Sequence, residues 1–267
     1  MPDDRLYTRL TIALLSAMIL VMAVSAAVPR LDIWVSAQFF EDGRGFPAAQ
    51  SPTYEWLGNV LRWVFEATAA VAFVLMVVAA LRGVRWQTGW RVWAFLFLTT
   101  AIGPGLIVNA LFKAHFGRAR PATILEFGGD KTFTPPFQIA GECARNCSFS
   151  SGEGALVAAV VIPVLVLAWP RLGGVARWAA GAAGVGLIIV TAGLRVIKGR
   201  HFLSDTLISI LLSALVALLL YRLLRVGPER HRLTGAALRA DLGWLGGGAV
   251  RLARAVFRRE RGDPGGA

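Results

Sequence analysis

Long apolar runs separated by short polar segments dominate this chain. A helix needs about 20 predominantly apolar residues to cross the roughly 30 Å hydrocarbon layer of a bilayer. Six runs match or approach that length, at residues 10–28, 63–81, 92–112, 154–169, 178–193 and 202–221. The pattern predicts an all-α polytopic membrane protein, with six transmembrane helices in a bundle.

The first run has a second interpretation, as the apolar core of a signal peptide with a small-residue cleavage site at 24–26. Its flank favours a membrane helix, because two acidic residues at positions 3 and 4 offset the basic residues there and the run is long. Both interpretations place the segment after Pro29 on the outer side of the membrane.

Composition and charge refine this picture. Hydrophobic residues make up 56% of the 267 positions, and 16% are charged. The net charge of +12 indicates orientation rather than nucleic-acid binding, since cytoplasmic loops of membrane proteins are rich in Lys and Arg. With the N-terminus inside, the inner segments hold 17 of the 28 basic residues, ten of them arginines beyond residue 221.

We therefore expect a protein of the cytoplasmic (inner) membrane with both termini in the cytoplasm. Residues 1–225 are expected to form the six-span domain. Residues 226–267 are expected to form a basic amphipathic tail held to anionic lipid of the inner leaflet.

The outer basic residues are unevenly placed. Eight of the 11 crowd into two segments, one beginning at Lys113 and the other at Arg195. Cations concentrated on the disfavoured side of a membrane suggest an anionic ligand. Lys113, Arg120 and Arg195 are the candidate binding residues, and the two guanidinium groups can each hold a pair of anion oxygens.

Two further segments on that face carry groups suited to cleaving a phosphate ester. Ser151 and Gly152 precede the fourth run, so their amides are expected to point free N–H groups at an anion. His201 and Asp205 lie four residues apart at the start of the sixth run, on one helix face. A carboxylate bonded to one ring nitrogen would leave the other nitrogen free to attack phosphorus.

The spacings Lys-x6-Arg-Pro from Lys113, Ser-Gly at 151–152 and Arg-x5-His-x3-Asp from Arg195 resemble the motifs of the type 2 phosphatidic acid phosphatase superfamily. The resemblance covers residues 10–225, including the six-span layout. It implies a membrane phosphatase that uses neither metal nor cofactor, with its active site at the outer membrane face.

The resemblance also implies a role for each matching position. Lys113, Arg120 and Arg195 would bind the phosphoryl group together with the backbone of 151–152. His201 would form a phosphohistidine intermediate, which Asp205 would orient.

The second motif departs from the family's usual Pro-Ser-Gly-His, whose histidine is the general acid, because Glu153 stands at that position. A free glutamate, with a pKa of about 4.3, is ionised near neutral pH and donates protons poorly. Apolar burial would raise that pKa, and the cations would lower it. We hypothesise that Glu153 protonates the leaving alcohol and later deprotonates the attacking water. Leu194 replaces a serine that is common before the third-motif arginine.

Four other residues have simpler interpretations. Cys143 and Cys147 fall in the expected outer loop between the third and fourth spans, where an oxidising compartment favours a disulfide. A metal site is the rival, although no histidine lies nearby. His115 is interpreted as a headgroup contact, and Glu66, inside the second span, is expected to pair with Arg62 one turn earlier.

Three functions are open at this stage. The leading one is hydrolysis of a lipid-linked phosphate monoester or diphosphate. The candidates by resemblance are lipid A phosphate, phosphatidylglycerophosphate, phosphatidate and undecaprenyl diphosphate. A phosphotransferase would pass the phosphoryl group to a sugar or lipid hydroxyl instead of water. A catalytically inactive lipid-phosphate binding or transport protein would keep only the anion site. The expected partners are membrane lipids, with no nucleic acid and an undetermined oligomeric state.

Overall fold

The computed structural model describes the backbone of residues 4–83 and 86–260 and the side chains of residues 5–83 and 86–247. Within this part of the chain, six helices are long and apolar enough to cross a membrane, and the predicted six-span architecture is confirmed. The spans are α1 (Asp4–Ala27), α4 (Pro52–Arg82), α5 (Trp90–Thr100) continued by η2 (Ala101–Phe112) and α6 (Lys113–His115), α7 (Gly152–Ala168), α8 (Gly174–Ile197) and α9 (Leu203–Leu223).

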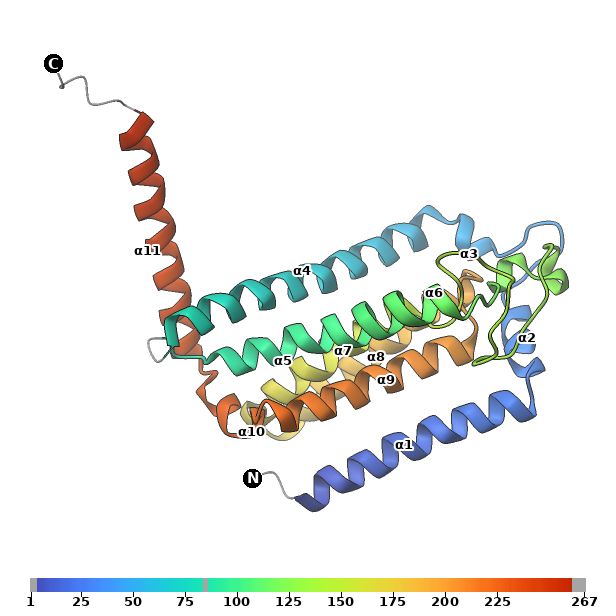
Figure 1. Ribbon diagram of the computed structural model, residues 1–267, viewed down its shortest axis with the longest axis horizontal. Coiled ribbons are helices and arrows are strands. Elements are labelled where there is room, and N and C mark those ends of the chain that lie inside the picture. Colours follow the sequence, from blue (N-terminus) through green and yellow to red (C-terminus); the bar gives the residue numbers. More distant parts are fainter. Residues whose placement is uncertain (1–3, 84–85, 261–267) are drawn as a thin grey trace.

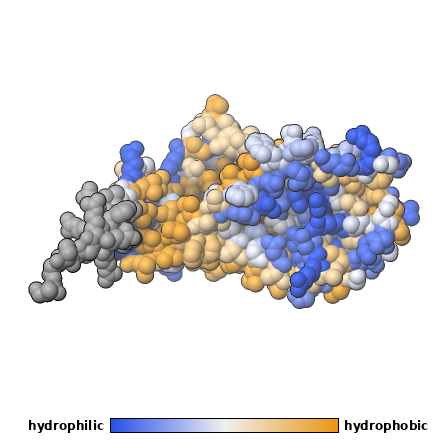
Figure 2. All heavy atoms as spheres, turned by 90° about the horizontal axis from the view of Figure 1, so that it is seen from above, coloured by the Kyte–Doolittle hydropathy of each residue, from blue (hydrophilic) through white to orange (hydrophobic). Residues whose placement is uncertain are grey.

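The helices run side by side, so that α1 begins at the end of the bundle where the last helix, α11 (Gly235–Glu260), also lies (Figure 1). We call this the terminal end and the opposite end the site end. Helices α2 (Arg30–Ala37) and α3 (Pro47–Gln50) lie at the site end with the loop between α6 and α7. An apolar surface covers the bundle towards the terminal end, and hydrophilic residues gather at the site end (Figure 2).

Helix α4 begins at Pro52, well before the predicted start at 63. Proline fits the first helical position because its missing N–H would have no partner there. Polar residues lower the mean hydropathy of residues 52–62, so the apolar pattern did not include them in the span. Three of these residues, Glu55, Asn59 and Arg62, line a cavity. Helix α8 likewise extends beyond the predicted 178–193 at both ends.

The third span changes its helical form halfway. Helix α5 is regular, but residues 101–112 form the π-helix η2, with Pro104 inside it. Proline has no N–H to give to an α-helical bond, and π-helical turns are rare and often mark functional sites. Pro104, Gly105, Asn109 and Lys113 all line the cavity, so this distorted half of the span forms one of its walls.

Helices α7 and α9 form the centre of the bundle, with half of each span buried. Small residues allow close packing there: a Cβ on Gly103 would lie 3.3 Å from the Ser213 hydroxyl. Helix α1 packs along α9 and is otherwise peripheral.

Two short elements, α10 (Val226–Glu229) and η6 (Arg230–Arg232), lead into α11. Asp241 of α11 accepts hydrogen bonds from the amides of Gln87 and Thr88, which fixes this helix to the loop after α4. The amphipathic tail was expected at residues 226–267, and its side chains beyond residue 247 lie outside the part that the structure describes.

Candidate active site

A polar cavity of about 640 Å³ opens at the site end between α4, η2, α7 and the end of α8. It contains residues from all three sequence motifs, which lie up to 82 positions apart in the chain. Its lining includes Asn109, Lys113, Arg120, Asn146, Gly152, Glu153, Arg195 and Arg200. The structure thus brings the predicted phosphate-binding side chains into one space.

Four of these residues form what we call the cation cluster: Lys113, Arg120, Arg195 and Arg200. Burial lowers the pKa of Arg120, and the charges of Arg200 and Arg195 lower it further. These positive charges repel one another, so a bound anion between them would be stabilised. Arg200 was not singled out from the sequence, because it occupies no motif position.

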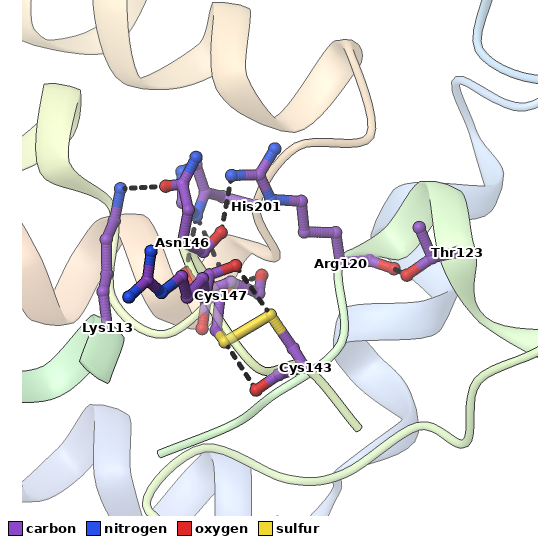
Figure 3. The surroundings of a disulfide bond; sticks show 10 residues. Lys113, Arg120, Thr123, Cys143, Asn146, Cys147 and His201 are labelled. Carbon is purple, nitrogen blue, oxygen red and sulfur yellow. Dashed lines mark hydrogen bonds and ion pairs between the residues drawn. A yellow bond between two sulfur atoms is a disulfide. The ribbon is translucent and has the colours of Figure 1, made fainter. Parts of the chain in front are cut away.

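Asn146 lies between two members of the cation cluster (Figure 3). Its side-chain oxygen is 3.3 Å from Lys113 Nζ, and its backbone carbonyl accepts a hydrogen bond of 2.6 Å from Arg120. The residue has a φ of 52°, which asparagine tolerates better than most residues. A disulfide joins Cys143 and Cys147 on either side of it, so the bridge closes the loop that carries Asn146.

His201 is almost completely buried, with 1% of its surface exposed. Its Nδ1 lies 2.6 Å from the Ser148 carbonyl oxygen. Because a carbonyl can only accept, Nδ1 carries the proton and the lone pair of Nε2 remains free. Burial places the pKa of His201 well below its usual value, and the charges of Lys113, Arg195 and Arg120 lower it further. The ring is therefore neutral at physiological pH.

The expected direct hydrogen bond between Asp205 and His201 is wrong. The Asp205 carboxylate lies 3.9 Å from Nδ1 of His201, beyond hydrogen-bonding distance, because the Ser148 carbonyl occupies that position. Asp205 instead accepts a hydrogen bond of 2.5 Å from the Ser148 hydroxyl and one of 3.0 Å from the Phe202 amide. It therefore reaches the histidine through Ser148.

Asp205 belongs to a buried network that the sequence did not reveal. Arg118 is fully buried and pairs with Asp205 at 2.5 Å and with Asp32 at 2.9 Å. Asp32 also accepts hydrogen bonds from the backbone and side chain of Ser204. We call Asp32, Arg118, Ser148, Ser204 and Asp205 the buried network. It links α2, the first motif and α9 beneath the histidine.

The start of α7 differs in part from the prediction. Ser151 caps the helix, since its hydroxyl accepts a hydrogen bond of 3.2 Å from the Gly154 amide. The prediction that its own N–H is free for an anion is wrong, because this N–H donates to the Asp205 carbonyl at 3.3 Å. The amides of Gly152 and Glu153 are the remaining donors of this first turn. A Cβ on Gly152 would lie 2.8 Å from the side-chain oxygen of Asn109 and 3.2 Å from Lys113 Nζ, so a larger residue would displace these two cavity side chains.

Glu153 lines the cavity and pairs with Arg195 at 3.0 Å. Each of the two side chains keeps about a fifth of its surface exposed, so the pair is accessible from the cavity. Glu153 is therefore a carboxylate in direct contact with the cation cluster, at the position that the sequence assigned to the acid.

The loop that carries His201 is anchored to α4. Lys198 is buried and its ammonium lies 3.0 Å from the carboxylate of Glu55. Gly199 follows with a φ of +60°, and a Cβ there would lie 2.5 Å from the ring of Phe46. The close approach of Phe46 and the left-handed backbone both require glycine.

The structure also places three other residues that the sequence singled out. Glu66 does not pair with Arg62, because Arg62 donates to the Asn59 side chain at 3.2 Å instead. His115 is exposed and its ring contacts the Leu111 carbonyl. Leu194 is buried, and packing replaces any hydroxyl contact at that position.

The six-span fold and the comparison with known families define the class of this protein. Residues 94–227, half of the chain, match the model of the PAP2 superfamily, and the chain belongs to this family. Together with the relatives below, the match identifies a membrane lipid phosphatase.

Three curated relatives are each named lipid A 4'-phosphatase. The protein from Francisella tularensis subsp. novicida is 32% identical over 188 residues, covering 66% of this chain and 78% of the relative. That from Rhizobium etli is 30% identical over 209 residues, covering 73% and 79%. That from Rhizobium leguminosarum is 39% identical over 118 residues, covering 44% and 48%.

A solved structure, the transmembrane PAP2 type phosphatidylglycerolphosphate phosphatase from Bacillus subtilis, is also similar. It is 19% identical, with a TM-score of 0.48 over 82% of this chain and 96% of that one.

Proposed function

We propose that the protein hydrolyses a phosphate monoester on the headgroup of a phosphorylated glycolipid and releases the phosphate. The glycolipid is a lipid A or a chemically similar lipid. The names of the three relatives support the substrate class. The observation that carries the chemistry is His201, a neutral imidazole with a free Nε2 whose pKa is lowered by burial and by the charges of Lys113, Arg195 and Arg120. An uncharged ring nitrogen with an available lone pair is a nucleophile at neutral pH.

In the first step, Nε2 of His201 attacks phosphorus and the bond between phosphorus and the lipid oxygen breaks. The cation cluster and the amides of 152–153 stabilise the charge on the non-bridging oxygens. Arg195 releases its partner Glu153 and binds the phosphoryl group instead. Glu153, in its protonated form, then gives its proton to the leaving alkoxide.

In the second step, water attacks the phosphohistidine. Glu153 accepts the proton of the water, the bond between phosphorus and Nε2 breaks, and inorganic phosphate leaves. No metal or cofactor takes part in this scheme, because the chain supplies cations, nucleophile and acid. Asp205 acts through Ser148, whose carbonyl keeps the proton of His201 on Nδ1.

The charge distribution supports an orientation for the site. We place the cavity on the outer side of the cytoplasmic membrane, both termini in the cytoplasm, and the tail from residue 226 against the inner leaflet. A disulfide at the site end agrees with an oxidising compartment there.

The experiment is phosphate release from lipid A by purified protein in nanodiscs, with His201→Ala alongside. Loss of the histidine should reduce kcat about a thousandfold or more. Glu153→Gln should reduce it about 100-fold. Acid-labile labelling of the wild-type protein by a phosphate-labelled substrate would trap the phosphohistidine.

The rival functions produce different results in the same assay. A phosphotransferase would form a phosphorylated product only when a sugar or lipid acceptor is added. A binding protein would release no phosphate, and His201→Ala would change nothing.

A further inference from the structure

One face of α4 carries polar side chains deep into the membrane-spanning part of the protein. Glu55, Asn59, Arg62 and Glu66 are spaced by four, three and four residues, which aligns them on one side of a helix, and all four line the cavity. At a rise of 1.5 Å per residue this stripe extends about 16 Å along the helix. On the face of the molecule seen in Figure 2, hydrophilic residues likewise reach from the site end partway along the bundle.

The members of this stripe differ in how they are bonded. Glu55 pairs with Lys198 and thereby anchors the loop before His201. Arg62 donates one hydrogen bond to Asn59, which leaves other donors of its guanidinium for a ligand. Glu66 is exposed on the bundle, and among the side chains that the structure describes none forms a hydrogen bond or ion pair with it.

The third span contributes Phe97, Thr100, Ala101 and Gly105 to the cavity lining, and the Thr100 hydroxyl is already bonded to the Phe97 carbonyl. A carboxylate within the apolar thickness of a membrane is costly, and such residues usually face a ligand or an ion path. Glu66 therefore points to a ligand that donates hydrogen bonds.

The cavity is also larger than a phosphate group requires. At about 640 Å³ it lies within the range of roughly 300–1,000 Å³ that holds drug-sized ligands. Besides the cation cluster, its lining includes Glu66, about three helical turns along α4 from Glu55. The cavity therefore has room for the group that carries the phosphate.

We propose that three members of this stripe, Asn59, Arg62 and Glu66, form a subsite for a hydroxyl-rich headgroup, a sugar ring of the lipid phosphate. The carboxylate accepts hydrogen bonds from ring hydroxyls, and the amide and guanidinium donate to ring and hydroxyl oxygens. Phosphatidate has no free hydroxyl on its glycerol and would leave Glu66 without a partner. This inference rests on the proposed function. Such a subsite makes the active site selective for phosphorylated glycolipids.

The test compares two substrates in nanodiscs, lipid A and dioleoyl phosphatidate, for the wild-type protein, Glu66→Gln and Asn59→Ala. We expect Glu66→Gln to lower kcat/KM for lipid A about tenfold or more, since a hydrogen bond to a charged group contributes about 1.5–3 kcal/mol. Hydrolysis of phosphatidate should change less than about twofold. Thr68→Ala is the matched control, because the Thr68 hydroxyl bonds to the Val64 carbonyl of its own helix.

A binding measurement makes the subsite testable without catalysis. Monoglucosyl diacylglycerol, which has no phosphate, should raise the Tm of the wild-type protein more than diacylglycerol does. Glu66→Gln should lose this difference and Thr68→Ala should keep it.

Each other outcome counts against the subsite. An equal loss on both substrates, or no preference for the glucosyl lipid, overturns it while hydrolysis by the wild type leaves the proposed function standing. An effect of Arg62→Gln without one of Glu66→Gln would assign the stripe to a second anion. If the wild type releases no phosphate from either lipid, the proposed function fails and the Tm comparison alone decides on the subsite.

Discussion

Arg118 and Arg120 are two residues apart in the same motif, and they lie in opposite electrostatic environments. Arg118 is fully buried and contacts two carboxylates, those of Asp32 and Asp205. Arg120 lines the cavity, and its nearest charged neighbours include Arg195 and Arg200. The buried arginine has its anions built into the fold, whereas the cavity arginine has to find one in a ligand.

This difference separates the two tasks of the site. The buried network holds the histidine and its carbonyl partner in place, and it is satisfied before any substrate arrives. The cation cluster contains excess positive charge that only an anion relieves, with Glu153 as a partial substitute. Stability should therefore depend on the first group and substrate turnover on the second.

The largest effect is expected from Arg118→Met. The substitution keeps an apolar stem of similar length but leaves two buried carboxylates without their cation, which costs about 3–5 kcal/mol. Unfolding followed by tryptophan fluorescence in micelles should show this loss. Arg44→Met is the control, because that arginine forms only an exposed ion pair with Glu41. An unchanged stability of Arg118→Met would contradict the structural role of the network.

Arg120→Met should have the reverse profile. Removal of one charge-stabilising donor reduces kcat/KM for a lipid phosphate about 100-fold to 1,000-fold. Stability should stay the same or rise, because Arg195 and Arg200 no longer repel the charge of Arg120. Measured side by side, Arg118→Met should lose mainly stability, and Arg120→Met should lose mainly activity. A loss of stability as large as that of Arg118→Met would remove the distinction between the two groups.

The sequence predicted the cavity half of this comparison better than the buried half. Cations at unusual positions and their motif spacings were visible in Lys113, Arg120 and Arg195. The ion pair of Arg118 with Asp32 joins residues 86 positions apart, and nothing local in either segment indicates it. Ser148 was equally hidden, because it holds His201 through a backbone carbonyl, which every residue has.

The helices show the same limit. Hydropathy located all six spans, but it averages over every face of a helix and therefore missed the first turns of α4, where polar residues face the cavity. Pro104 indicated a disturbance in the third span without specifying a π-helix.

His201 contacts the buried network through the Ser148 carbonyl, and the charges of the cation cluster lower its pKa. The dependence of stability on pH should reveal this lowered pKa. The pKa of His201 in the folded protein is well below the value of about 6.5 expected in the unfolded chain. Below pH 6.5 the unfolded state therefore binds one more proton than the folded state. As the pH is lowered, the free energy of unfolding should fall by up to about 1.4 kcal/mol per pH unit. Unfolding between pH 5 and 7 should lose this slope in His201→Gln. The control His115→Gln replaces an exposed ring.

The smallest effect concerns the disulfide, which positions a cavity contact without carrying charge. Serine at Cys143 and Cys147 would release the loop that holds Asn146 between Lys113 and Arg120. We expect a rise of a few-fold in KM with little change in kcat, because the two cations lose a fixed spacing but the histidine keeps its carbonyl partner. Asn146→Ala should do less, since the backbone carbonyl that contacts Arg120 remains. A fall in kcat alone would instead place the loop in the buried network, on the side of the comparison that supports the histidine.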